Sequence, residues 1–300
     1  KFAMLTGVTK FGKVSVFSDL NNLKDISLNN RYYNLCGIDE GELHGVFEPY
    51  VQCLADSQNI TLDKAYSELK RNYDGYHFSK NMVGMYNPFS LLNAFDSLEI
   101  GSYWFETGTP SYLVELLKRH DFKLDELKEN KVTANVLSAI DASSSNPISV
   151  IFQSGYLTIS GYNERYKLYS LDFPNEEVRE GFMLYLMPYY TSVSVNKTGF
   201  QISCFVEEVK SGDISGFMAR LKSFFANVPY DLIKDTENHY QNVLFILCNL
   251  CGLYTKAEFH TSNGRVDMTI ETPDYVYVFE FKYNGTAEEA MSQIKEKNYA

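Results

Sequence analysis

Residues 265–282 read RVDMTIETPDYVYVFEFK, two stretches of alternating polar and apolar residues on either side of a short turn. Successive side chains of a strand point to opposite faces of a sheet, so this alternation predicts a β-hairpin with strands at 265–271 and 275–282. Asp267 lies on the polar face of the first strand, and Glu280 and Lys282 share one face of the second. The other face of the second strand carries four aromatic residues, Tyr275, Tyr277, Phe279 and Phe281.

The turn between the two stretches fixes how the predicted strands pair. Pro273 cannot take the positive φ of a type I′ turn, so a four-residue loop built around a type I turn is expected. A loop centred between Pro273 and Asp274 places Asp267 directly opposite Glu280, with Cβ atoms about 5 Å apart. Two carboxylates at that separation repel each other unless a cation lies between them. Lys282 is one candidate for this cation, and a divalent metal ion is a better one.

A helix is predicted on each side of the hairpin. Residues 231–254 have apolar residues at helical spacing, and Glu237 lies in the first half of this stretch. After the hairpin, Thr286 and Glu289 have the spacing of a capping box, which predicts a helix that carries Gln293. The order of parts is therefore helix, hairpin and helix.

These residue types suit the hydrolysis of a phosphodiester by metal-activated water. Asp267 and Glu280 can bind Mg²⁺ or Mn²⁺, because hard divalent cations prefer carboxylate oxygens. The metal would acidify a bound water and polarise a phosphoryl oxygen. Lys282 would orient that water or neutralise charge on the phosphate, and Glu237 would complete the metal shell.

The same residues resemble the PD-(D/E)XK nuclease superfamily, whose motif is an acidic residue followed on the next strand by Glu/Asp-x-Lys. Asp267 and Glu280-Phe281-Lys282 match that motif, and Val266 replaces the proline that often precedes the first acidic residue. The resemblance implies metal ligands at Asp267, Glu280 and Glu237. It implies catalytic roles for Asp267, Glu280, Lys282 and Gln293. DNA is the expected substrate, although the residues leave RNA open.

Several segments upstream resemble a bacterial family that joins an AAA-ATPase-like module to such a nuclease domain; they are residues 5–11, 17–23, 86–89, 104–110 and 153–158. The resemblance implies an α/β fold with three parts. Residues 1–140 would be the C-terminal part of the ATPase-like domain, 141–203 a winged-helix-like linking region, and 204–300 a restriction-endonuclease-like domain. The chain is then expected to be a fragment that lacks the phosphate-binding loop and is truncated at its C-terminus. ATP would bind only with the upstream region present, and the ATPase-like module allows an oligomer.

The rest of the chain gives weaker structural signals. A buried strand is expected at 2–6, helices at 61–71, 110–117 and 176–189, and a loop at 72–88. Residues 156–160 and 166–171 read as a hairpin, 148–153 as a helix or a strand, and 205–225 as helix broken near Gly212. The serine-rich stretch 141–147 is the predicted linker.

Charge is the main argument against a nuclease. The chain has a net charge of −11, and residues 201–300 hold nine Lys and Arg against fourteen Asp and Glu. Nucleic-acid-binding proteins usually carry a basic surface. Two other interpretations therefore stay open: a non-catalytic regulatory or interaction protein that keeps the nuclease fold as a scaffold, and an ATP-driven switch.

Several other motifs have a simpler structural explanation. Residues 7–14 nearly spell a phosphate-binding loop, but Val14 stands where Ser or Thr is required. Cys248 and Cys251 lie in an apolar helix and suggest packing rather than zinc binding. His260 has no visible partner, and Trp104 suggests core packing. No apolar run is long enough to span a membrane, and the five irregularly spaced cysteines fit a reducing, cytoplasmic compartment.

Overall fold

The computed structural model describes residues 24–107, 111–129, 131–138, 147–191, 193–226, 236–252, 254–262, 265–282 and 284–296. The chain divides into two compact units. Unit 1 runs to His120 and also contains residues 127–179, and unit 2 contains residues 121–126 and 180–300. The strand expected at 2–6, the near phosphate-binding loop at 7–14 and the break at 141–146 lie outside the described residues. No helix in the described ranges has both the length and the apolar composition needed to cross a membrane.

Unit 1 is mainly helical, and its first four helices share one apolar core. Its helices are α1 (Glu40–Gly45), α2 (Glu48–Gln58), α3 (Leu62–Tyr73), α4 (Pro88–Ser97), a 3₁₀ turn (Trp104–Thr107), α5 (Ser111–Arg119), α6 (Glu126–Glu129), α7 (Ala134–Leu137) and α8 (Ile148–Gln153). The helices predicted at 61–71 and 110–117 are thus confirmed as α3 and α5. The stretch 148–153, left open between helix and strand, is helical.

Local sequence explains where these helices begin. The Thr61 side chain accepts a hydrogen bond from the Lys64 backbone N–H and so caps α3. Asn87 caps α4, and Pro88 stands at its first position, where a missing N–H leaves no bond unmade. Between these helices the predicted loop is closed by a bridge between Tyr76 and Met85.

A three-stranded antiparallel sheet completes unit 1. Its strands are β1 (Lys131–Val132), β2 (Thr158–Asn163) and β3 (Leu168–Asp172), in the order β1-β3-β2. The predicted hairpin is confirmed, with a bulge between Ile159 and Gly161. His77 ties the loop after α3 to this sheet, because its Nδ1 lies 2.7 Å from the Ile159 carbonyl oxygen.

Aromatic packing accounts for the half-buried Trp104. Its ring meets Phe105 and Tyr156 edge to face, with centroids 5.1 and 4.9 Å away. The backbone N–H groups of Tyr103 and Trp104 donate to the Glu177 Oε1, at 2.6 and 3.0 Å. Burial raises the pKa of the Glu177 carboxyl. Trp104 is a packing residue, as its sequence context suggested.

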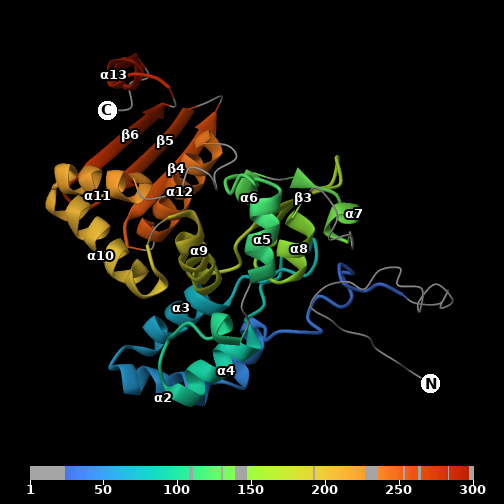
Figure 1. The fold of residues 1–300 in the computed structure, drawn as a ribbon. Coiled ribbons are helices and arrows are strands. Elements are labelled where there is room, and N and C mark those ends of the chain that lie inside the picture. Colours follow the sequence, from blue (N-terminus) through green and yellow to red (C-terminus); the bar gives the residue numbers. More distant parts are fainter. Residues whose placement is uncertain are drawn as a thin grey trace. The chain divides into compact units, whose positions relative to one another are not determined.

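The described residues of unit 2 form helices, an antiparallel sheet and a final helix (Figure 1). Helix α9 (Glu176–Tyr190) begins in unit 1 and continues into unit 2. The later helices are α10 (Val195–Ser211), α11 (Ile214–Ala226), α12 (Thr236–Cys251) and α13 (Ala287–Glu296). The break predicted near Gly212 is confirmed, since Gly212 ends α10 in the left-handed conformation with φ 82°. Helix α10 begins ten residues before the predicted Phe205, because apolar residues before Phe205 continue the helical pattern.

The sheet of unit 2 has the order β4-β5-β6, with β4 (Lys256–Ser262), β5 (Arg265–Glu271) and β6 (Val276–Lys282). The predicted hairpin is confirmed as β5 and β6, while β4 was not predicted. Its sequence holds the same signal in weaker form, because Ala257 and Phe259 alternate with Lys256, Glu258 and His260.

One face of this sheet packs on the helices of unit 2. Phe259, Met268 and Phe279 stand directly opposite one another on the three strands and so share that face. Phe259 meets Phe245 of α12 with ring centroids 5.6 Å apart, and Phe279 meets Phe217 of α11 at 5.1 Å. Met268 is fully buried. The aromatic face predicted for the second strand is therefore its core face.

Candidate functional site

The β5–β6 turn sets the register that the sequence predicted. Four residues, 272–275, join the strands, and the Thr272 N–H donates to the Tyr275 carbonyl at 2.8 Å. The Thr272 hydroxyl also accepts a hydrogen bond from the Tyr275 N–H at 3.0 Å. With the loop closed in this way, Asp267 pairs with Glu280 in the antiparallel ladder. The register inferred from Pro273 is confirmed.

Glu280 lies on the sheet face opposite to the helix-packed one, because its neighbour Phe279 points into the core. Both carboxylate oxygens of Glu280 are shielded from solvent. For Asp267 the structure describes the backbone, which pairs with Glu280, but not the side chain. The structure therefore brings the two acidic positions together at the level of the backbone.

Lys282 follows Glu280 on the same strand face and is half-buried. Its aliphatic stem runs beside the loop that leads into α13. A Cβ placed on Gly285 would lie 2.9 Å from the Lys282 Cβ and 3.2 Å from its Cδ. The absence of a side chain at Gly285 thus leaves room for the lysine stem.

Helix α13 is held at its start by the predicted capping box. The Thr286 N–H donates to Glu289 Oε2 at 2.9 Å, and the Glu289 N–H donates to the Thr286 hydroxyl at 3.2 Å. The helix packs beside β6 and carries the half-buried Gln293. Gln293 is thus in a helix adjacent to the strand of Glu280 and Lys282.

Glu237 lies in the first turn of α12 and accepts a hydrogen bond from Gln241 Nε2 at 3.1 Å. Helix α12 covers the Phe259 face of the sheet, which is the face opposite to that of Glu280. To bind the same metal ion as Glu280, the Glu237 side chain would have to extend around the end of the sheet. A metal-binding role for Glu237 therefore stays a prediction.

The added strand β4 gives the candidate site a residue that the sequence did not suggest. His260 pairs with Asp267 on the side away from Glu280, so the three positions form one row across the sheet. The His260 side chain is exposed, and its Nε2 lies 3.8 Å from Glu258 Oε2.

The two cysteines of α12 are structural. Cys248 and Cys251 are both buried, and burial raises the pKa of the Cys251 thiol. A thiol held protonated in an apolar helix is a poor zinc ligand or nucleophile. The packing role expected from the sequence agrees with this environment.

Comparison with known proteins identifies the hairpin domain. Residues 235–300 match the family model described as the PD-(D/E)XK nuclease superfamily. The chain is 37% identical over 316 residues to the "Uncharacterized protein in vnfD 5'region" of Azotobacter chroococcum mcd 1. That match covers all of this chain, and this chain spans 57% of the relative's length. No solved structure matches the chain. Residues 235–300, with the Asp267–Glu280 register at their centre, form a domain of the PD-(D/E)XK nuclease superfamily.

Proposed function

We propose that this domain hydrolyses phosphodiester bonds of nucleic acid, with DNA as the first candidate substrate, using a divalent metal ion. The observation that carries the proposal is the backbone register, which pairs Asp267 with Glu280. Lys282 lies two residues beyond Glu280 on the same strand face. Membership of the superfamily supports a nuclease-like function for this arrangement.

The residues fit a hard divalent cation. Nucleases of this superfamily usually use Mg²⁺ or Mn²⁺. Such ions prefer carboxylate oxygens, and a solvent-shielded carboxylate facing a second acidic position favours a bound cation. Among the described side chains no three of His, Cys, Asp and Glu gather around one point, and that set does not contain Asp267. Asp267 and Glu280 would hold the ion, with Glu237 completing its shell.

Each proposed residue has a distinct task in the reaction. When bound, the metal ion supplies Lewis acidity and a water of lowered pKa. Asp267 and Glu280 bind and place it. The Lys282 ammonium, whose stem lies against the Gly285 loop, orients the attacking water or neutralises charge on the phosphate. Gln293 of α13 supports this arrangement from the neighbouring helix.

The wider architecture is part of the proposal. Residues 1–140 would belong to an ATPase-like domain, and residues 141–203 would link it to the nuclease domain in the manner of a winged helix. ATP binding by the longer protein would then be coupled to cleavage, in the cytoplasm. The net charge of −11 supports one rival, a non-catalytic protein that uses the nuclease fold to bind a partner.

Metal binding and DNA cleavage test the proposal together. Titration with Mn²⁺ by calorimetry should show binding by the chain that Asp267→Ala and Glu280→Ala abolish. Lys282→Ala should retain metal binding and lose cleavage by on the order of a hundredfold or more. Asp274→Ala removes an exposed carboxylate of the same hairpin and serves as the matched control.

Three outcomes separate the alternatives. Loss of both Mn²⁺ binding and DNA cleavage in Asp267→Ala and in Glu280→Ala supports the proposed nuclease activity. Metal binding without cleavage of DNA or RNA supports the non-catalytic rival. If the wild-type chain binds no metal, the hairpin carboxylates are part of a scaffold and the proposal is wrong.

A further inference from the structure

A pocket of about 420 Å³ opens at the end of the unit 2 sheet that carries the β5–β6 turn. It is lined by Lys210 near the end of α10, by Tyr254, Thr255 and Lys256 where α12 leads into β4, and by Glu271 and Thr272 where β5 ends. Asp267 lies four residues back along β5, roughly 13 Å away at the rise of a strand. The pocket is therefore separate from the hairpin site but lies on the same sheet.

Two lysines, Lys210 and Lys256, line this pocket of an acidic chain. Lys256 donates to both oxygens of Glu271 at 2.9 Å, which uses two of the three N–H groups of its ammonium. Lys210 is exposed, and no carboxylate of the described residues lies within ion-pair distance of it. The lining residues themselves therefore carry two ammonium groups and one carboxylate, and the Glu180 carboxylate lies outside the lining, near Tyr254.

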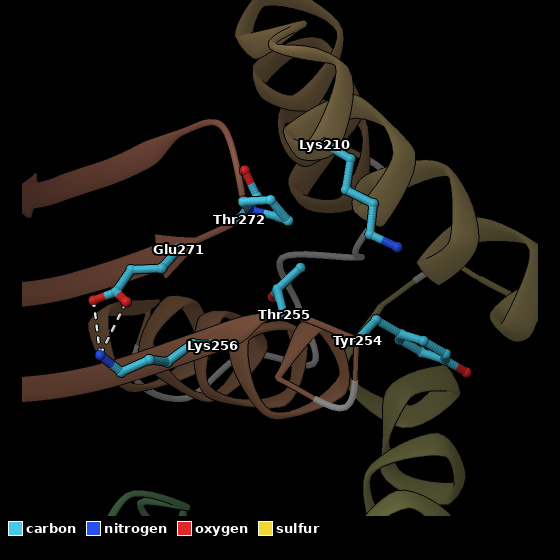
Figure 2. A pocket seen from close by; sticks show the side chains of 7 residues that line it. Lys210, Tyr254, Thr255, Lys256, Glu271 and Thr272 are labelled. Atoms are coloured by element: carbon cyan, nitrogen blue, oxygen red, sulfur yellow. Dashed lines mark hydrogen bonds and ion pairs between the residues drawn. The ribbon is translucent and has the colours of Figure 1, made fainter.

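An aromatic ring, that of Tyr254, lines the same pocket. The Tyr254 side chain is 56% exposed. Burial and the nearby Glu180 carboxylate raise the pKa of the Tyr254 hydroxyl. Figure 2 shows the Lys210 and Tyr254 side chains extending on one side of the pocket, while Lys256 and Glu271 meet on the other.

A cation beside an exposed aromatic ring is the combination that recognises a nucleoside phosphate. The ammonium attracts the phosphate, and every base has a face that stacks on an aromatic side chain. Lys210 taken alone has a simpler role. It lies in the last turn of α10, where a positive charge interacts favourably with the helix dipole. That role would not require Tyr254 or the pocket.

We propose that this pocket binds one nucleotide of a nucleic-acid strand, with the phosphate at Lys210 and the base on Tyr254. This inference rests on the proposed function and deepens it, because it states how an acidic domain holds its substrate. A separation of roughly 13 Å corresponds to about four stacked nucleotides at 3.4 Å each. The strand would be anchored in the pocket and cleaved at the hairpin.

Binding without metal tests the pocket separately from catalysis. The probe is a fluorescein-labelled 15-nucleotide thymidine strand, titrated with the full chain in EDTA and followed by fluorescence anisotropy. Lys210→Glu and Tyr254→Ala should each weaken binding at least about fivefold. Lys210→Glu should also lower the slope of log affinity against log salt by about 0.7. Tyr254→Phe keeps the ring and should bind like the wild type.

A substitution of opposite sign sharpens the test. Glu271→Gln removes the carboxylate that competes for Lys256 and should tighten binding. Lys222→Glu is the matched control for Lys210→Glu, because Lys222 is an exposed lysine of α11 outside the pocket lining. The proposal is overturned if Lys222→Glu weakens binding as much as Lys210→Glu, or if Tyr254→Ala binds normally.

Two further arms identify the ligand and keep the two proposals apart. Adenosine monophosphate that displaces the strand at concentrations near the strand's own Kd would assign the pocket to a free nucleotide. Weak displacement would assign it to a strand. Asp267→Ala and Glu280→Ala should not weaken strand binding in EDTA, because without metal their carboxylates repel the phosphates. Loss of cleavage in the hairpin variants without loss of strand binding tests the proposed catalytic function. Loss of strand binding in the pocket variants tests the proposed role of the pocket.

Discussion

At the scale of single residues, Gly285 controls the space that Lys282 occupies. An alanine Cβ at 2.9 Å from the Lys282 Cβ cannot be accommodated without a shift, because the Lys282 Cβ is held by strand β6. We expect Gly285→Ala to displace the loop and the lysine stem. A displacement of about 1 Å at a reacting group can lower a rate by on the order of a hundredfold.

Gly285→Ala should therefore reduce single-turnover DNA cleavage by on the order of tenfold or more. Mn²⁺ affinity measured by calorimetry should stay within a few-fold, since the three atoms nearest the new methyl group belong to Lys282 and Glu289 and to none of the proposed metal ligands. Gly199→Ala is the control, because a Cβ there meets nothing within 4 Å. Wild-type cleavage by Gly285→Ala would show that the loop does not position Lys282.

The sequence predicted the residues of the hairpin because three local signals agreed there. Alternation assigned the faces, Pro273 excluded the two-residue turns, and an even loop then fixed Asp267 opposite Glu280. His260 was missed because its strand, β4, is as long as β5 but contains only two apolar residues, Ala257 and Phe259, so its alternation is weak. His260 lies beside Asp267 because β4 pairs with β5, and a local sequence pattern does not predict which strands pair.

At the scale of elements, α13 depends on its cap more than on packing. Among its described side chains none is buried, so helix formation gains little from core contacts. Thr286→Ala removes the hydroxyl that accepts the Glu289 N–H and should destabilise the helix by about 1 kcal/mol. Hydrogen exchange should show faster exchange at the Glu289 amide.

Thr286→Ser retains the hydroxyl and should leave that amide protected. If the two variants exchange alike, the capping box does not stabilise α13. The box itself was predictable, because Thr286 and Glu289 are three residues apart ahead of an apolar residue. The early start of α10 was not predicted, since residues 195–204 include a glycine and several polar residues, and only the few apolar residues among them continue the helical pattern.

At the scale of the whole molecule, unit 2 is assembled from segments that are far apart in the chain. Residues 121–126 belong to it although more than fifty residues of unit 1 follow them. The tie is made by asparagines on α12. Asn242 accepts from the Leu124 N–H at 2.8 Å and donates to the Phe122 carbonyl at 3.0 Å. Asn238 donates to the Asp121 carbonyl at 2.6 Å.

The sequence did not reveal this tie. Asn238 and Asn242 are four residues apart and lie on one side of α12, but polar residues in an amphipathic helix normally indicate the solvent face. Both are almost fully buried, and their partners are backbone groups of a short segment without a recognisable pattern. Side-chain to backbone bonds between distant segments follow from the folded chain and not from local sequence.

Loss of this tie should detach the segment. Asn242→Ala leaves the buried Leu124 N–H and Phe122 carbonyl without their side-chain partner, which should destabilise the fold by about 2 kcal/mol or more. Asn249→Ala is the matched control, because Asn249 is a buried asparagine of the same helix whose side chain donates to the Phe245 carbonyl of that helix at 2.8 Å, and in the described part of the chain it makes no bond to the 121–126 segment. Hydrogen exchange should show the Leu124 amide exposed in Asn242→Ala and protected in Asn249→Ala. Equal protection of Leu124 in both variants would mean that apolar packing of Phe122 and Leu124, which are both buried, is enough to hold the segment against α12.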